Sequence, residues 1–178
     1  MTDYSTLVDH IHQQLKPYEY VLDTDHVIPN ALYISYIRDH GIFMVRNVCA
    51  VLDIPDNLTR TEPLKRYFHY IRTNLLHEYG EAFIWKELEF CLVGICSDQA
   101  FQEIRDSEAK LVEAVSFSFN SLLGCCFINR SNLDLYVHST WGLFFSGTHY
   151  KAIRQSVEEW CNKERERLKP GNSSSVGT

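Results

Sequence analysis

The sequence lacks a long apolar run, a glycine-rich phosphate loop and a secretory signal. The uncharged stretch 115–128 in its second half has 14 residues, whereas a membrane span needs about 20. No Gly-x-Gly-x-x-Gly or Gly-x4-Gly-Lys-Ser/Thr pattern occurs, which excludes the common nucleotide-binding loops. Residues 1–15 carry acids, histidine and glutamine in place of a basic start and an apolar core. We therefore expect a cytoplasmic protein without a membrane span.

Basic side chains are also in short supply. Lysine and arginine number 17 against 23 aspartates and glutamates, which gives a net charge of −6. An acidic surface opposes binding to a phosphate backbone, so we expect no nucleic-acid partner. Hydrophobic residues make up 45% of the 178, enough for the core of one domain. We predict one globular domain over 1–169 and a flexible tail over 170–178.

Six cysteines are present, and each lies in an apolar stretch. Without an export signal they are expected to be free thiols in a reducing compartment, where a buried cysteine acts as a small hydrophobe. None has a partner at the spacing of a zinc site, since Cys91-x4-Cys96 lacks a second cysteine or histidine pair. His10 and His12 point about 200° apart on a helix. We predict no metal site and no cofactor.

Helical periodicity dominates the chain. The clearest segment is 61–80, which opens with Thr61, Glu62 and Pro63 and ends at Gly80. Weaker helical stripes cover 3–15, 81–96, 107–127 and 149–168. The apolar stripe of the clearest segment consists of Leu64, Tyr67, Phe68, Ile71, Leu75 and Tyr79. These patterns predict a mainly α, single compact domain of about seven helices.

An α+β domain is the alternative, with hairpins near 31–52 and 124–146. Residues 42–52 fit a helical stripe, but Phe43, Val45, Asn47, Cys49 and Val51 also alternate as a strand would. Periodicity does not resolve short apolar runs of this kind. The choice between helix and hairpin stays open at 42–52 and 116–146.

Three groups of residues are candidates for ligand binding. Arg66 and His69 share a basic, titratable helix face that suits a small anion, although a solvated face explains them equally well. Trp85, Trp141 and Phe145 belong to a surplus of aromatics that suits an apolar pocket, although core packing also accounts for them. His149 follows Ser146-Gly147-Thr148, where a loop enters a helix and amides could bind an anion. A helix cap explains the same four residues.

No motif specifies a reaction, which leads to three hypotheses of function. The first is a non-catalytic regulatory or adaptor protein that acts through protein contacts and forms a homodimer. The second is a small-molecule sensor or carrier with an aromatic-lined pocket for an apolar or anionic ligand. The third is a cysteine- and histidine-dependent enzyme, with Cys161, His149 and His138 as the nearest candidates in sequence.

Overall fold

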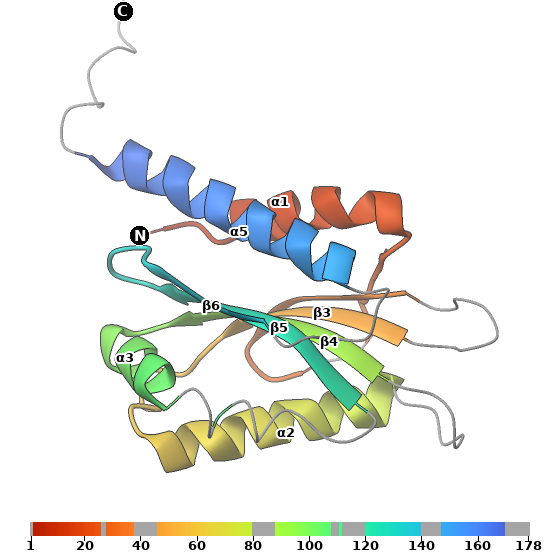
Figure 1. Ribbon diagram of the computed structural model, residues 1–178, viewed down its shortest axis with the longest axis horizontal. Helices are drawn as coiled ribbons and strands as arrows, with labels where there is room; N and C mark the ends of the chain where they lie inside the picture. The colour runs from red at the N-terminus through yellow and green to blue at the C-terminus, as the bar shows by residue number, and fades with distance from the viewer. Residues whose placement is uncertain are drawn as a thin grey trace, which may run out of the picture.

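The computed structural model is a mixed β-sheet covered by helices on both faces (Figure 1). It describes residues 2–25, 28–37, 46–79, 88–107, 111, 120–139 and 147–169. Helices α1 (Ser5–Leu15) and α5 (Gly147–Leu168) cover one face, and α2 (Thr61–Tyr79) and α3 (Asp98–Asp106) cover the other. A short 3₁₀ turn, η1 (Lys16–Tyr18), follows α1.

The sheet has six strands whose spatial order is their order in the sequence. The central strands β3, β4 and β5 are parallel, and the outer pairs β1–β2, β2–β3 and β5–β6 are antiparallel. Their bounds are β1 (Val21–Leu22), β2 (Ala31–Tyr36), β3 (Arg46–Asp53), β4 (Leu88–Cys96), β5 (Asn120–Asn129) and β6 (Leu135–Ser139).

The prediction of a mainly α domain of about seven helices is wrong, because the fold is α+β. The alternative with hairpins near 31–52 and 124–146 matches it, since β2 pairs antiparallel with β3 and β5 with β6. Two stretches with helical stripes contain strands instead, 81–96 with β4 and 107–127 with the start of β5. The stretch 42–52, where the choice stayed open, contains most of β3.

The central strands were misread because helices cover both of their faces. Val48 to Leu52 of β3 are all fully buried, so the segment has no polar alternation to mark it as a strand. Without the two-residue period, apolar residues three and four apart mimic a helical stripe. Burial of the central strands on both faces is therefore the reason that they were predicted as helices.

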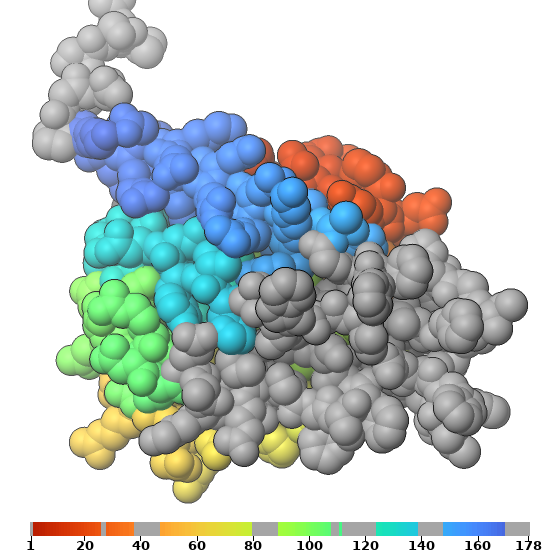
Figure 2. All heavy atoms as spheres, viewed as in Figure 1, coloured from red at the N-terminus to blue at the C-terminus, as the bar shows by residue number. Residues whose placement is uncertain are grey.

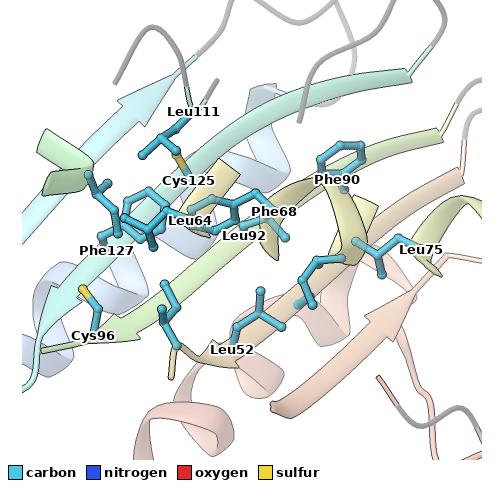
Figure 3. Close-up of a cluster of buried hydrophobic side chains, with 14 of the residues drawn as sticks. Leu52, Leu64, Phe68, Leu75, Phe90, Leu92, Cys96, Leu111, Cys125 and Phe127 are labelled. Atoms are coloured by element: carbon cyan, nitrogen blue, oxygen red, sulfur yellow. The ribbon is translucent and has the colours of Figure 1, made fainter. Parts of the chain in front are cut away.

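The helix predicted at 61–80 is confirmed as α2, with Leu64, Phe68, Ile71 and Leu75 buried. Figure 3 shows Leu64, Phe68 and Leu75 together with Leu52, Phe90, Leu92 and Phe127 of the sheet. A second core lies on the opposite face, where Leu7, Ile11 and Leu15 of α1 pack with Ile153, Val157 and Trp160 of α5. The sheet therefore separates two apolar layers.

All six cysteines are free and buried, as the apolar context predicted. Figure 2 shows one face of the molecule, where segment 120–139 lies between α5 and α3. Among the described residues, no helix has the length and apolarity needed to cross a membrane.

Candidate functional site

The structure does not bring the predicted binding residues together. Arg66 and His69 are exposed on α2, whereas His149 lies in the first turn of α5, beyond the opposite face of the sheet. The His149 ring packs on Tyr18, with 4.5 Å between ring centroids, and its Nδ1 lies 3.4 Å from the Tyr20 hydroxyl. Trp85, Trp141 and Phe145 lie outside the described residues.

Cys161 and His149 do not form a reactive pair either. Cys161 and His149 are twelve positions apart on α5, about 18 Å along the helix axis. Burial raises the pKa of Cys161 to about 12, so its thiolate is scarce at neutral pH. Within the described ranges, no three histidine, cysteine, aspartate or glutamate side chains are grouped closely enough to hold a metal ion.

A cleft of about 550 Å³ opens instead between the start of α1 and the edge of the sheet. Tyr4 and Val8, which the helical stripe of 3–15 assigned to the core, are only half-buried and form part of its wall. The full lining consists of Thr2, Asp3, Tyr4, Ser5, Val8, Asp9, Leu32 and Asp53. This is the α1-side hollow.

A second hollow of about 200 Å³ opens at the same strand edge. Its wall includes Ile28, Ala31 and Ile34, which pack with the core beneath α2, and Tyr33, which packs with the core beneath α1 and α5. The full lining consists of Leu22, Asp23, Ile28, Ala31, Leu32, Tyr33 and Ile34. We call this the α2-side hollow. The two hollows, together with the strand edge that they share, are called the β2-edge site.

Leu32 is the residue that the two hollows share. The register of β2 on β3 shifts between Ala31 and Tyr33, which leaves Leu32 without a partner in β3. Such a bulge redirects a side chain, and the Leu32 side chain is 45% exposed. A single irregularity in one strand therefore creates the centre of the β2-edge site.

Exposed aliphatic side chains gather at this edge. Val21 and Leu22 of β1 are 50% and 46% exposed, and Leu22 lines the α2-side hollow together with Leu32. The remaining large apolar side chains exposed in the described segments are far from one another in sequence, Tyr70 on α2 and Leu168 at the end of α5. Exposed apolar side chains that share a hollow are a feature of interaction sites.

The outer side of β2 is only partly paired, and the Ala31 amide there donates to the Ile28 carbonyl oxygen. β1 is two residues long and pairs only with Ser35 and Tyr36, and the Asp23 amide donates to the Ile34 carbonyl oxygen. No strand among the described residues pairs with the outer side of 31–33. An unpaired strand edge is a template for an added strand.

Among the described residues that line the β2-edge site, every charged one is an aspartate. Asp53 is bound by the guanidinium of Arg130, whose Nη1 also donates to Asp56 at 2.6 Å. The Asp3 carboxylate accepts from the Ser5 amide at 2.9 Å, which lowers its pKa. Asp9 makes no hydrogen bond or ion pair with any described residue.

Tyr4 places a buried polar atom beside these carboxylates. Its ring packs on Trp160, with 5.7 Å between centroids, and burial raises the pKa of its phenol to about 12. The hydroxyl oxygen makes no hydrogen bond within the described part of the chain. The α1-side hollow therefore combines an aromatic wall, a neutral phenol and an acidic rim.

Sequence reasoning did not find this site, because its residues come from four separate segments. Tyr4 and Val8 differ from the core residues of α1 only in being incompletely buried. The sequence does not show this difference. No family model matches the chain, and neither curated proteins nor solved structures give a match.

Proposed function

We propose that this chain is a regulatory or adaptor protein that binds an extended segment of another protein at the β2-edge site. The observation that carries the proposal is the partly unpaired outer side of β2, with the exposed side chains of Leu22 and Leu32 in the hollow beside it. Addition of a strand to a sheet edge is a recurring mode of peptide recognition.

The two hollows suit such a segment because they open at the same strand edge and share Leu32. The α1-side hollow includes Tyr4 and Val8, which pack with the core beneath α1 and α5. The α2-side hollow includes Ile28 and Ile34 from the core beneath α2, and Tyr33 from the other core. A segment bound along this edge would therefore contact apolar side chains of both cores.

A second copy of the chain is a poorer occupant than a different protein. In a twofold contact the same patch meets itself, so Asp3, Asp9, Asp23 and Asp53 would approach their own counterparts. Like charges across an interface oppose association. The homodimer expected from the sequence stays a prediction, and we do not assign the β2-edge site to it.

The thiols favour a non-catalytic role. Burial raises the pKa of Cys96, Cys126 and Cys161 to about 12 and that of Cys49 and Cys91 further. Thiols of this kind are inert, whereas nucleophilic cysteines have a lowered pKa and access to solvent. This supports an adaptor over a cysteine-dependent enzyme.

The test is selection of random dodecapeptides on the full chain, followed by binding assays on a Leu22→Ser/Leu32→Ser variant. Both side chains are about half exposed, so the variant should fold. We expect micromolar peptides whose affinity falls about tenfold in the double variant, as for loss of interface anchors. The matched control is Tyr70→Ser, because Tyr70 on α2 is equally exposed. This variant should leave the peptide affinity unchanged.

Two outcomes would overturn the proposal. One is the recovery of no peptide, or of peptides that bind the double variant as well as the wild-type chain. The other is a small molecule retained by the freshly purified protein in native mass spectrometry and lost in the double variant. That result would assign the β2-edge site to a sensor or carrier.

A further inference from the structure

The β6 edge of the sheet, opposite the β2-edge site, has open backbone groups. β6 is the last strand in the sheet order and pairs with β5. The Asn129 amide donates to the Asp134 carbonyl oxygen where this antiparallel ladder begins. Because the backbone groups of successive residues in a strand face opposite sides, those of Leu135 and Val137 face away from β5. They make no hydrogen bond with any described residue, so they are available to an added strand.

The side chains of β6 do not protect this edge from pairing. Native edge strands are usually protected by charged residues or proline, and Leu135–Ser139 contains neither. Leu135 and Val137 pack at the margin of the core beneath α1 and α5, and Tyr136 packs at the margin of the core beneath α2. All three are only partly buried, and Figure 2 shows part of segment 120–139 at the surface between α5 and α3. A strand added to β6 would therefore extend the apolar contacts on both faces of the sheet.

The β6 strand of a second copy of the chain complements this edge. In an antiparallel pair about a twofold axis, Leu135 of each copy lies opposite Val137 of the other, and each such pair exchanges both of its hydrogen bonds. Tyr136 then faces its own counterpart across the axis, and cross-strand aromatic pairs stabilise a sheet. The alternative register, which places Val137 opposite itself, sets Leu135 against the polar Ser139. The first register therefore matches apolar side chains better.

The charges at this edge also favour a second copy. Asp134 immediately precedes β6, and in the first register it lies opposite His138 of the second copy, which attracts a carboxylate when its ring is protonated. The Asp134 carboxylate also lies 3.9 Å from Arg165 on α5, so this end of the strand is not purely acidic. Among the described residues of β6 and its flank, no acid meets an acid in this register. The aspartates of the β2-edge site, by contrast, would meet their own counterparts.

We propose that the chain forms a homodimer by antiparallel pairing of β6 with β6 of a second copy, which joins the two sheets into one. The β2-edge sites then lie at the two far ends of the joined sheet, where both stay accessible to a partner. This proposal goes beyond the proposed function and does not depend on it. A contact between two short strands buries less surface than a standard interface, so we expect a weak dimer with a Kd on the order of 10–100 µM.

Sedimentation velocity of the full chain, from about 5 µM to about 500 µM, measures the dimer at concentrations on both sides of the expected Kd. Val137→Pro removes an outward amide and leaves the hydrogen bonds to β5 in place, since proline is tolerated where the N–H of an edge strand faces outward. We expect this variant to dimerise at least about tenfold more weakly than the wild-type chain. The matched control is Leu22→Ser/Leu32→Ser at the opposite edge, which should dimerise as the wild-type chain does. Circular dichroism checks that each variant is folded.

An added cysteine tests the register without relying on proline. Tyr136→Cys places two thiols opposite each other across the axis, in a pair whose Cα atoms are about 4.5 Å apart, within reach of a disulfide. All six native cysteines are buried, so the added thiol is the accessible one. With oxidised glutathione as the oxidant, we expect a covalent dimer on a non-reducing gel. Tyr70→Cys, at a half-exposed position on α2, is the matched control and should stay monomeric on the same gel.

Three results would overturn the proposal. The first is a wild-type chain that stays monomeric over the whole concentration range. The second is a dimer that a folded Val137→Pro variant forms as readily as the wild-type chain. The third is a Tyr136→Cys chain that forms no more covalent dimer than Tyr70→Cys, and this result decides the matter if the proline variant does not fold. A monomeric chain that still binds the selected dodecapeptides would overturn the dimer alone, and a β6 dimer that binds none of them would overturn the proposed function alone.

Discussion

The ring of Tyr150 on α5 lies directly against the backbone of Gly124 in β5, where a Cβ atom would overlap it. The Tyr150 hydroxyl lies 2.8 Å from the carbonyl oxygen of His138 and 3.2 Å from that of Cys125. Gly124 and Ser139 are partners in the β5–β6 register. One aromatic side chain thus joins α5 to both strands of the hairpin.

Gly124→Ala should destabilise the fold. The added methyl group meets the rigid ring of a buried tyrosine and forces α5 away from the sheet, at a cost of about 1–3 kcal/mol in the free energy of unfolding. Urea denaturation measures the loss. In a Tyr150→Ala background the same glycine change should cost much less, and an equal cost in both backgrounds would contradict the contact.

Tyr150→Phe keeps the ring and removes the hydroxyl that bonds the His138 and Cys125 carbonyls. We expect a loss of about 1 kcal/mol in the free energy of unfolding, the usual value for a buried hydrogen bond. Tyr70→Phe on α2, whose side chain is half exposed, is the matched control and should be neutral. A neutral Tyr150→Phe would mean that only ring packing matters at this position.

Stability should fall at alkaline pH. Burial raises the pKa of the Cys126 and Cys161 thiols from 9.0 to about 12, and that of the Tyr4 and Tyr67 phenols from 10.0 to about 12. The folded state keeps these protons while the unfolded state loses them, so the contribution is complete below pH 9 and is lost as pH rises toward 12.

Urea unfolding at several pH values between about 8 and about 11 measures this loss as a falling free energy of unfolding. Cys126→Ala should make the fall less steep, because one fewer buried group resists ionisation. A free energy of unfolding that is constant across this range would contradict the burial of these groups.

The thiols should resist alkylation in the native protein. All six cysteines are buried and free, and iodoacetamide reacts with accessible thiolates. We expect no adduct on the native chain by intact mass spectrometry and one adduct on each cysteine in urea. Rapid modification of a single native cysteine would instead reveal a reactive thiol and revive the enzyme hypothesis.

Arg130 joins two aspartates through exposed ion pairs. Arg130→Ala removes the cation that binds Asp53 and Asp56. The free energy of unfolding in urea should fall by about 1 kcal/mol or less, because both ion pairs are partly exposed. A loss of several kcal/mol would contradict this assignment.

The amphipathic helices were predictable because each buries a single stripe. The patterns at 3–15, 61–80 and 149–168 correspond to α1, α2 and α5, which begin and end within a few residues of those bounds. A helix packed on one layer displays the 3.6-residue period of that contact in its sequence. The burial of the cysteines followed from their apolar neighbours in the same way.

The β2-edge site was not predictable, because it joins residues that only the fold brings together. Asp9, Leu22, Leu32 and Asp53 come from α1, β1, β2 and β3. The bulge that exposes Leu32 depends on how β2 pairs with β3, and no local pattern encodes that register.

The sequence by itself determined the helices that cover the sheet, the acidic balance and the apolar surroundings of the thiols. Only the tertiary structure decided that the intervening runs are strands and which of their edges stays open. The physical reason is that an element buried on one side shows a periodic alternation of apolar and polar residues. A strand buried on both faces is apolar throughout and shows no such alternation, and its pairing is set by packing between distant parts of the chain.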